Sequence, residues 1–266
     1  MREEEKIKNR IIAIFLQEYF ITKRSLEVIF DLFIYSTITI VLFGFVAKYL
    51  AGTNVAAAYY LVIGLLLWEV VRVTQYSITV AVMWNVWSRN LSNMFVSPLS
   101  AAEYFIALMI TSSLKSALVV IILSIIIYFV SGFDVLRIGF VNILLDFINL
   151  SIFAWAMGII ITGLIFRFGT RIQALSWGLI LLFQPLSATF FPITILPKPL
   201  QVLSFFIPIT HVFESARRNY LNQTTDWGSF FLALALNTVY FIASCLLFYY
   251  MFKKSRQTGQ FARNEG

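Results

Sequence analysis

The stretch AAYYLVIGLLLWEVVRVTQYSITVAV occupies residues 57–82, and its only charged side chains are Glu69 and Arg72. A helix needs about 20 consecutive, mostly apolar residues to cross the hydrocarbon core of a bilayer. The stretch exceeds that length, and it is much longer than an ordinary buried strand. It therefore predicts a membrane-spanning helix.

The rest of the chain has the same character. Hydrophobic residues make up 60% of the 266 residues and charged residues 12%, whereas a soluble domain has about 45–50% and about 25%. Five further apolar stretches qualify as spans, at residues 29–49, 104–130, 138–166, 172–190 and 230–252. We therefore expect an all-α membrane protein with six transmembrane helices over residues 29–252.

The basic residues predict the orientation. Six spans place both termini on one side of the membrane. If that side is the cytoplasm, thirteen of the flanking Lys and Arg residues lie inside and five lie outside. This asymmetry obeys the positive-inside rule. It also accounts for the net charge of +7 without nucleic acid, and it predicts a basic cytoplasmic tail at residues 253–266.

The segment before the first span, residues 1–28, mixes charges with apolar residues at helical spacing. Ile7, Ile11 and Ile14 fall on one helical face. A soluble tail would not need such a stripe. We expect an amphipathic helix that lies along the cytoplasmic leaflet.

The loop at residues 84–100 also has an apolar helical face. That face holds Trp84, Trp87, Leu91, Met94 and Phe95. Pro98 follows and disfavours helix at the residue before it. The pattern predicts a short amphipathic helix. The segment either lies on the membrane surface or docks a cytoplasmic partner, and aromatic residues anchor interfaces of the second kind.

A second irregular segment lies between the last two predicted spans. It and its flanks contain most of the prolines: Pro185, Pro192, Pro197, Pro199 and Pro208. The segment is apolar, but a crossing here would put the basic tail outside. We predict a re-entrant hairpin at residues 191–210, which enters the membrane from the outer face. Irregular backbone at that depth must be buried in protein or must line a water-filled cavity, so we expect the hairpin to line a cavity.

Charged residues within the predicted spans need an explanation, since a central charge costs about 2.5–3.5 kcal/mol on insertion scales. They are Glu69, Arg72, Lys115 and Asp146. One interpretation pairs Glu69 with Arg72, three residues apart on one face, and Lys115 with Asp146. The other places some of them along a polar translocation path.

Catalytic patterns are weak. The chain has a single histidine, His211, and no G-x-x-x-x-G-K-[ST] motif for ATP phosphates. We therefore expect no enzyme activity, no metal site and no cofactor in this chain. Energy for active transport would have to come from another polypeptide or from an ion gradient.

Three blocks of sequence, at residues 64–80, 88–105 and 185–221, resemble the ABC type-2 transporter permeases. The third block is the most specific. Its matching residues are Phe191–Pro192, Leu196–Pro197, Leu200, Pro208, Thr210, His211, Glu214 and Arg217. The resemblance extends over essentially the whole chain.

The resemblance implies six spans, an N-terminal interface helix, outer re-entrant helices and a homodimer that binds a separate ATPase subunit, which holds ATP and Mg. It implies ATPase docking at Val86, Trp87, Asn90, Leu91 and Met94. It implies an outer gate at Phe191, Pro192, Pro197 and Pro208. Many relatives carry an acidic residue near Asn85, so the neutral residue here departs from the pattern.

Together these features predict the permease subunit of an ATP-driven exporter in the inner membrane of a prokaryote, with an amphiphilic, drug-like or lipid-linked substrate. A subunit for export of lipid-linked glycans is an alternative. An ion-coupled carrier or channel is an alternative of another class, and it would use the intramembrane charges without an ATPase.

Overall fold

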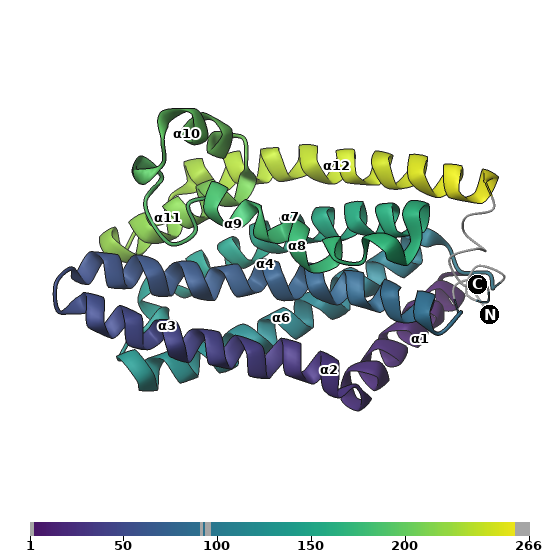
Figure 1. Ribbon diagram of the computed structural model, residues 1–266, viewed down its shortest axis with the longest axis horizontal. Coiled ribbons are helices and arrows are strands. Elements are labelled where there is room, and N and C mark those ends of the chain that lie inside the picture. The colour runs from purple at the N-terminus through teal and green to yellow at the C-terminus, as the bar shows by residue number, and fades with distance from the viewer. Residues whose placement is uncertain (1–2, 91–92, 94–96, 259–266) are drawn as a thin grey trace.

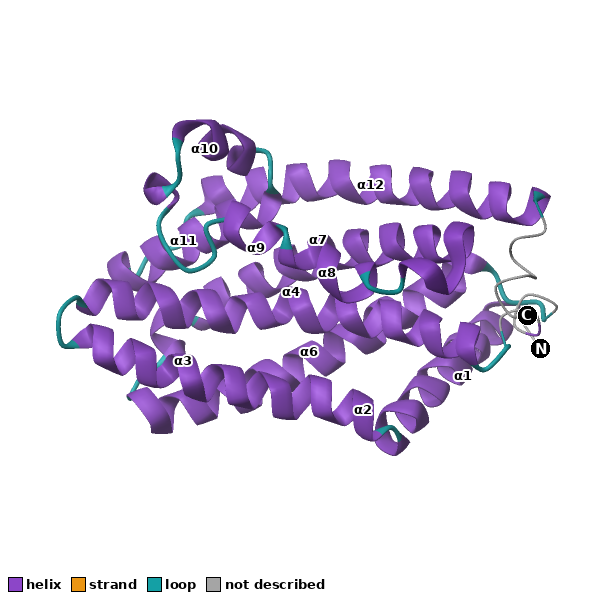
Figure 2. Cartoon of the chain, in the orientation of Figure 1, coloured by secondary structure: helices purple, strands orange, loops and turns teal. Residues whose placement is uncertain are grey.

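The computed structural model shows a bundle of helices whose long members run side by side (Figures 1 and 2). It describes residues 3–90, 93 and 97–258, and this part of the chain contains no strand. The α-helices are α1 (Glu3–Arg24), α2 (Leu26–Ile29), α3 (Ser36–Ala51), α4 (Val55–Trp87), α6 (Ala101–Ser131), α7 (Phe140–Phe168), α8 (Leu175–Leu181), α9 (Phe183–Leu186), α10 (Lys198–Phe205), α11 (Pro208–Asn222) and α12 (Trp227–Gln257). The π-helix η1 (Phe30–Tyr35) links α2 to α3, and the 3₁₀-helices are η2 (Val135–Ile138), η3 (Gly169–Ile172) and η4 (Ile193–Ile195).

Five helical segments of the described chain are long and apolar enough to cross a membrane. They are Leu26–Ala51, Val55–Trp87, Ala101–Ser131, Phe140–Phe168 and Trp227–Gln257. These segments coincide with five of the six predicted spans. The protein is therefore a multi-pass membrane protein.

The remaining predicted span, residues 172–190, the fifth along the chain, is not one continuous helix. It consists of the end of η3, then α8 and α9, which are separated at Leu182. Pro185 lies just after this break, and a proline ring clashes with the carbonyl of the residue four positions earlier. Ala188 then takes a left-handed conformation with φ of 52°, which ends α9. Six continuous spanning helices are therefore not confirmed, and the re-entrant position of residues 191–210 stays a prediction.

The helices α4 and α7 form the core of the bundle, and α3, α6 and α12 surround them. Small residues let the backbones approach. A Cβ at Gly158 of α7 would lie 3.0 Å from the side chain of Ile78 in α4. On the opposite side of α7, a Cβ at Gly163 would lie 3.2 Å from the backbone of Phe248 in α12.

The two ends of the bundle hold different elements (Figure 1). One end, called the α1 end here, holds α1, the start of α6 and the C-terminal part of α12. The other, the α11 end, holds the turn between α3 and α4 together with α10 and α11. The predicted docking loop begins at the α1 end of α4, and the predicted gate lies in the segment that contains α10 at the α11 end (Figure 1).

Candidate functional site

The first polar cluster lies where α1 packs across α6 and the end of α4. Arg10, Ile14, Gln17 and Glu18 lie along one side of α1, because Ile14, Gln17 and Glu18 follow Arg10 by four, seven and eight residues. Ile14 is buried in a hydrophobic cluster with side chains of α4 and α6. The polar members of this face reach three side chains of the bundle, and we call the six residues the α1 cluster: Arg10 with Glu103, Gln17 with Asn85, and Glu18 with Lys115.

The Arg10–Glu103 pair ties α1 to the first turn of α6. The Arg10 Nε lies 3.1 Å from each carboxylate oxygen of Glu103. Glu103 also accepts a hydrogen bond of 2.8 Å from the backbone N–H of Ser100, and the Ser100 hydroxyl accepts one from the backbone of Glu103. This reciprocal capping box satisfies N–H groups that the helix leaves free. One carboxylate therefore both starts α6 and holds α1.

Asn85 ties α1 to the end of α4. Its Oδ1 accepts a hydrogen bond of 3.0 Å from Gln17, and its Nδ2 donates to the hydroxyl of Tyr104 at 3.1 Å. Asn85 is 2% exposed. The side chain that departs from the family pattern thus lies inside the protein, where it makes contacts within the chain.

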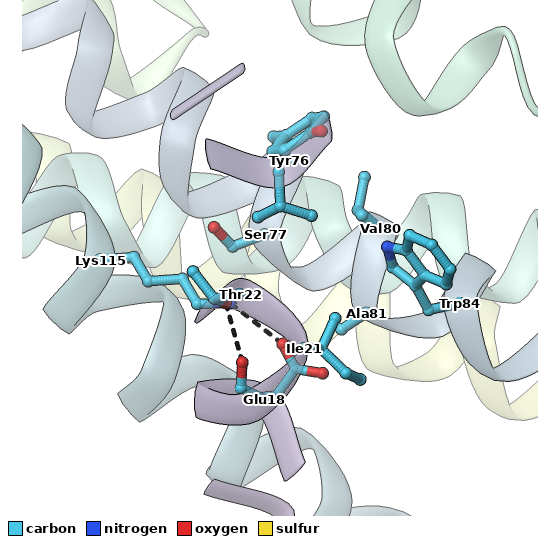
Figure 3. A pocket seen from close by; sticks show the side chains of 10 residues that line it. Glu18, Ile21, Thr22, Tyr76, Ser77, Val80, Ala81, Trp84 and Lys115 are labelled. Atoms are coloured by element: carbon cyan, nitrogen blue, oxygen red, sulfur yellow. Dashed lines mark hydrogen bonds and ion pairs between the residues drawn. The ribbon is translucent and has the colours of Figure 1, made fainter. Parts of the chain in front are cut away.

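The third contact is the ion pair between Glu18 and Lys115, with an Nζ to Oε2 distance of 3.0 Å (Figure 3). The predicted Lys115–Asp146 pair is therefore wrong. Asp146 is buried on α7, and its Oδ2 has no hydrogen-bond partner among the described residues. The sequence prediction missed Glu18 because it sought a partner for Lys115 only within the predicted spans, whereas α1 packs against α6. The position of α1 along the cytoplasmic leaflet stays a prediction.

The predicted docking residues lie in different surroundings. Val86 is buried in the core, Trp87 is 40% exposed and contacts Trp84 edge to face, and Asn90 is partly buried against Asn85. Leu91 and Met94 lie outside the described residues. Trp87 is thus partly exposed, whereas Val86 packs inside, and the docking role of these residues stays a prediction.

Two variants of Glu103 separate its two roles. Glutamine keeps an oxygen that can accept from the Ser100 N–H but removes the charge that pairs with Arg10, whereas alanine removes both contacts. We expect Glu103→Ala to lower the free energy of unfolding by about 1 kcal/mol more than Glu103→Gln does, the usual worth of a cap. Denaturant unfolding of both purified variants measures the difference, and equal losses would contradict the double role.

A second network lies within the spans, on the face of α4 that meets η1. Arg72 pairs with Glu69 at 2.8 Å, so this predicted pair is confirmed. The Arg72 Nη2 also donates to the backbone carbonyl of Asp31 at 3.2 Å and to the hydroxyl of Ser36. Tyr76 donates to the Asp31 carboxylate. The Arg72 guanidinium therefore donates a hydrogen bond to a carbonyl of the π-helix, and its positive charge is balanced by the carboxylate of Glu69.

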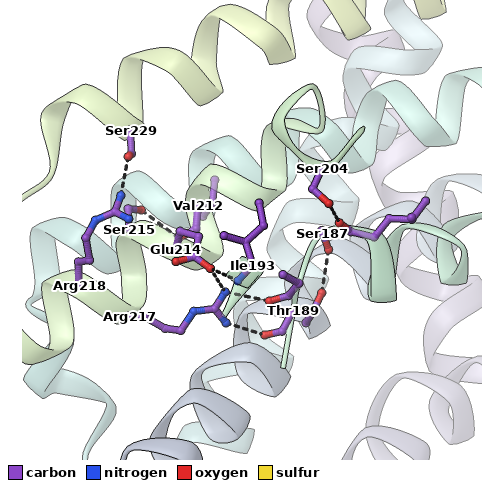
Figure 4. Close-up of polar contacts among 12 residues, drawn as sticks. Ser187, Thr189, Ile193, Ser204, Val212, Glu214, Ser215, Arg217, Arg218 and Ser229 are labelled. Atoms are coloured by element: carbon purple, nitrogen blue, oxygen red, sulfur yellow. Dashed lines mark hydrogen bonds and ion pairs between the residues drawn. The ribbon is translucent and has the colours of Figure 1, made fainter. Parts of the chain in front are cut away.

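The third cluster lies at the α11 end and centres on Arg217, which is 3% exposed (Figure 4). Arg217 donates to the carbonyls of Ala188 and Thr189, at 2.8 and 3.2 Å, and pairs with Glu214 at 3.0 Å. The same Glu214 oxygen accepts from the backbone N–H of Ile193 at 2.9 Å. Burial lowers the pKa of the Arg217 guanidinium, although Glu214 beside it acts in the opposite direction. We call these five residues the Arg217 cluster.

The Arg217 cluster holds an irregular turn against α4. A Cβ on Gly64 of α4 would lie 2.0 Å from the carbonyl oxygen of Thr189. Only glycine therefore allows this approach between the turn and the helix. The family motif named Glu214 and Arg217 from the sequence, but nothing in the sequence connected them with Thr189 or Gly64.

Three of the four predicted gate residues lie at the starts of helices. Pro192 precedes η4, Pro197 is the N-cap of α10, and Pro208 is the first residue of α11, where a missing N–H costs nothing. Phe191 and Pro192 are half-buried, Pro197 is exposed and Pro208 is buried. Phe191 and Pro192 follow the turn that Arg217 holds by two or three residues along the chain, and the role of the four residues in gating stays a prediction.

The fold and these clusters define a multi-pass helical membrane protein with a polar junction at each end. The family model described as ABC-2 type transporter matches residues 10–221, so the chain belongs to the membrane-domain family of ABC-2 type transporters. The matched range includes the α1 cluster and the Arg217 cluster. The chain is thus a membrane permease component and not a catalytic ATPase domain. No curated protein matches it at a significant level.

Proposed function

We propose that this chain is the permease subunit of an ATP-driven exporter and that two copies form the path for an amphiphilic, drug-like or lipid-linked substrate. A separate ATPase subunit would bind ATP and Mg²⁺ and dock at the cytoplasmic side of a prokaryotic inner membrane. Family membership supports an ATPase partner in general. The absence of a phosphate-binding motif from the sequence agrees with a division of labour between chains.

The observation that carries the proposal is the position of the α1 cluster around the predicted docking loop. That loop leaves α4 just after Asn85 and enters α6 just before Glu103. Both of these residues bond to α1, through Gln17 and Arg10. A partner that displaces the loop would therefore move α1, α4 and α6 together.

Helix α4 provides the connection to the other end. It carries Asn85 in the α1 cluster and Gly64 against the turn of the Arg217 cluster. At 1.5 Å per residue these positions are about 32 Å apart along one continuous helix. We infer that displacement at the docking loop reaches the outer gate as a movement of α4 against Thr189, since rigid elements carry coupling between distant sites.

Docking can be tested at Trp87. We expect Trp87→Ala to reduce the amount of ATPase subunit that co-purifies with the tagged chain by at least tenfold, the effect of losing an interface anchor of about 1.4 kcal/mol or more. Combination with Leu91→Ala, at a position outside the described residues, should reduce it further.

Trp227→Ala is the matched control, because Trp227 is 51% exposed at the opposite end of the long helices. It should leave co-purification unchanged. Equal retention of the ATPase by wild-type chain and the Trp87→Ala variant would remove the docking assignment. Absence of any ATPase from the wild-type preparation would count against the proposed function as a whole.

A lipid-linked glycan exporter would use the same junctions, so it differs only in substrate. The ion-coupled carrier is less well supported, because Glu69, Arg72 and Lys115 all have ion-pair partners. Flux through proteoliposomes that contain this chain alone, driven by an ion gradient, would favour the carrier. Flux that requires ATP and the ATPase would favour the exporter.

A further inference from the structure

An apolar groove of about 430 Å³ lies between α1, η1 and α6. Its walls are formed by Phe15, Tyr19, Leu32, Phe33, Leu114 and Leu118. The volume is within the range of sites that bind small organic ligands, about 300–1,000 Å³. We call it the α1–α6 groove. It is separate from the Arg217 cluster and from the predicted docking loop, neither of which contributes to its walls.

Two lysines line the groove, and one of them, Lys115, has an ion-pair partner. Lys115 is neutralised by its ion pair with Glu18. Lys23 lies exposed in the last turn of α1, at the rim of the groove. Arg24 beside it places its guanidinium over the ring of Phe20. Among the described lining residues, Lys23 therefore supplies the one positive charge that Glu18 does not neutralise, and most of the other lining side chains are apolar.

We propose that the α1–α6 groove binds one anionic phospholipid, with an acyl chain along the apolar walls and the phosphate against Lys23. The arrangement matches an amphiphile whose head carries a net negative charge. A zwitterionic lipid would bring a cation of its own to the same rim, and inorganic phosphate would leave the apolar walls unfilled. The proposal rests on the proposed cytoplasmic position of the α1 end, where anionic lipid surfaces attract basic residues.

The test uses the full-length chain in detergent, with binding of short-chain phosphatidylglycerol and of phosphatidylcholine measured by native mass spectrometry. We expect phosphatidylglycerol to bind about fivefold more tightly, the preference that a single basic residue at the membrane surface supplies. Lys23→Gln should abolish the preference. Lys48→Gln is the matched control, since Lys48, like Lys23, is exposed in the last turn of a helix but lies on α3, outside the groove, and it should keep the preference.

A second variant tests the walls. Leu114 is 54% exposed, so Leu114→Trp should fold normally while filling the groove, and it should weaken binding of both lipids. Equal binding of the two lipids by the wild-type chain would overturn the proposal, as would a preference that survives Lys23→Gln. Competition by glycerol phosphate as strong as that by the lipid would also overturn it, because the site would then be a headgroup anion site. None of these readouts involves the ATPase, so failure here is distinguishable from failure of ATPase co-purification.

Discussion

Replacement of Gly64 by alanine is expected to lower the free energy of unfolding by at least about 1–3 kcal/mol, the usual cost of overpacking. The added Cβ would lie 2.0 Å from the carbonyl oxygen of Thr189 and 2.9 Å from its carbonyl carbon. Both atoms belong to the backbone, so no side-chain rotation relieves the clash. The turn that Arg217 holds would have to move away from α4. Thermal unfolding of the purified chain measures the loss, and transport in proteoliposomes should fall with it.

Gly178 of α8 supplies the control for Gly64. A Cβ at Gly178 meets no atom within 4 Å, and alanine is a better helix former than glycine by up to about 1 kcal/mol. Gly178→Ala should therefore leave the stability unchanged or raise it. A Gly64→Ala variant as stable as the wild-type chain would show that the turn does not pack on α4 in this way.

Replacement of Arg217 by methionine is expected to have the larger effect, a loss of about 3–5 kcal/mol in the free energy of unfolding, as when one partner of a buried ion pair is removed. The variant would leave the carbonyls of Ala188 and Thr189 without their donor and Glu214 without its cation. Ala188 already has a positive φ of 52°, which an L-residue adopts only at a cost. The turn should therefore become disordered. Under the proposed function, export would be lost even where the protein still inserts.

The neighbouring Arg218→Met is the matched control. Arg218 pairs with Asp226 at the surface, where the side chains are 47% and 28% exposed. Exposed pairs contribute about 0–1 kcal/mol, so this variant should lose little stability and keep transport. If the two substitutions lowered the free energy of unfolding by similar amounts, the buried contacts of Arg217 would stabilise the protein no more than the exposed pair of Arg218 does.

The break within residues 172–190, the fifth predicted span, could have been predicted from the sequence. Pro185 is visible within residues 172–190, and a proline inside a helical pattern interrupts or kinks it. The prediction relied on average hydrophobicity, which is insensitive to a single break. The left-handed Ala188 is different, because the turn that contains it is held by Arg217 and packs through Thr189 on Gly64 of α4. No local sequence pattern contains these contacts.

The two ion pairs that involve residues of the spans also differ in whether the sequence predicts them. Glu69 and Arg72 are three residues apart, so helix geometry alone brings them together, and the structure pairs them. Lys115 finds its partner in Glu18, 97 residues away. That contact exists because α1 lies across α6. The residue spacing within one helix does not predict which other helix packs on it.

Composition and local spacing alone were enough to establish five membrane-spanning helices and the pairing within α4. They suffice because lipid selects for long apolar segments and because a helix repeats the same geometry everywhere. Only the folded chain revealed that α1 packs against the bundle and that Arg217 holds the turn at Ala188 and Thr189 against α4. These features depend on residues far apart in sequence, whose mutual distances are set by the whole bundle.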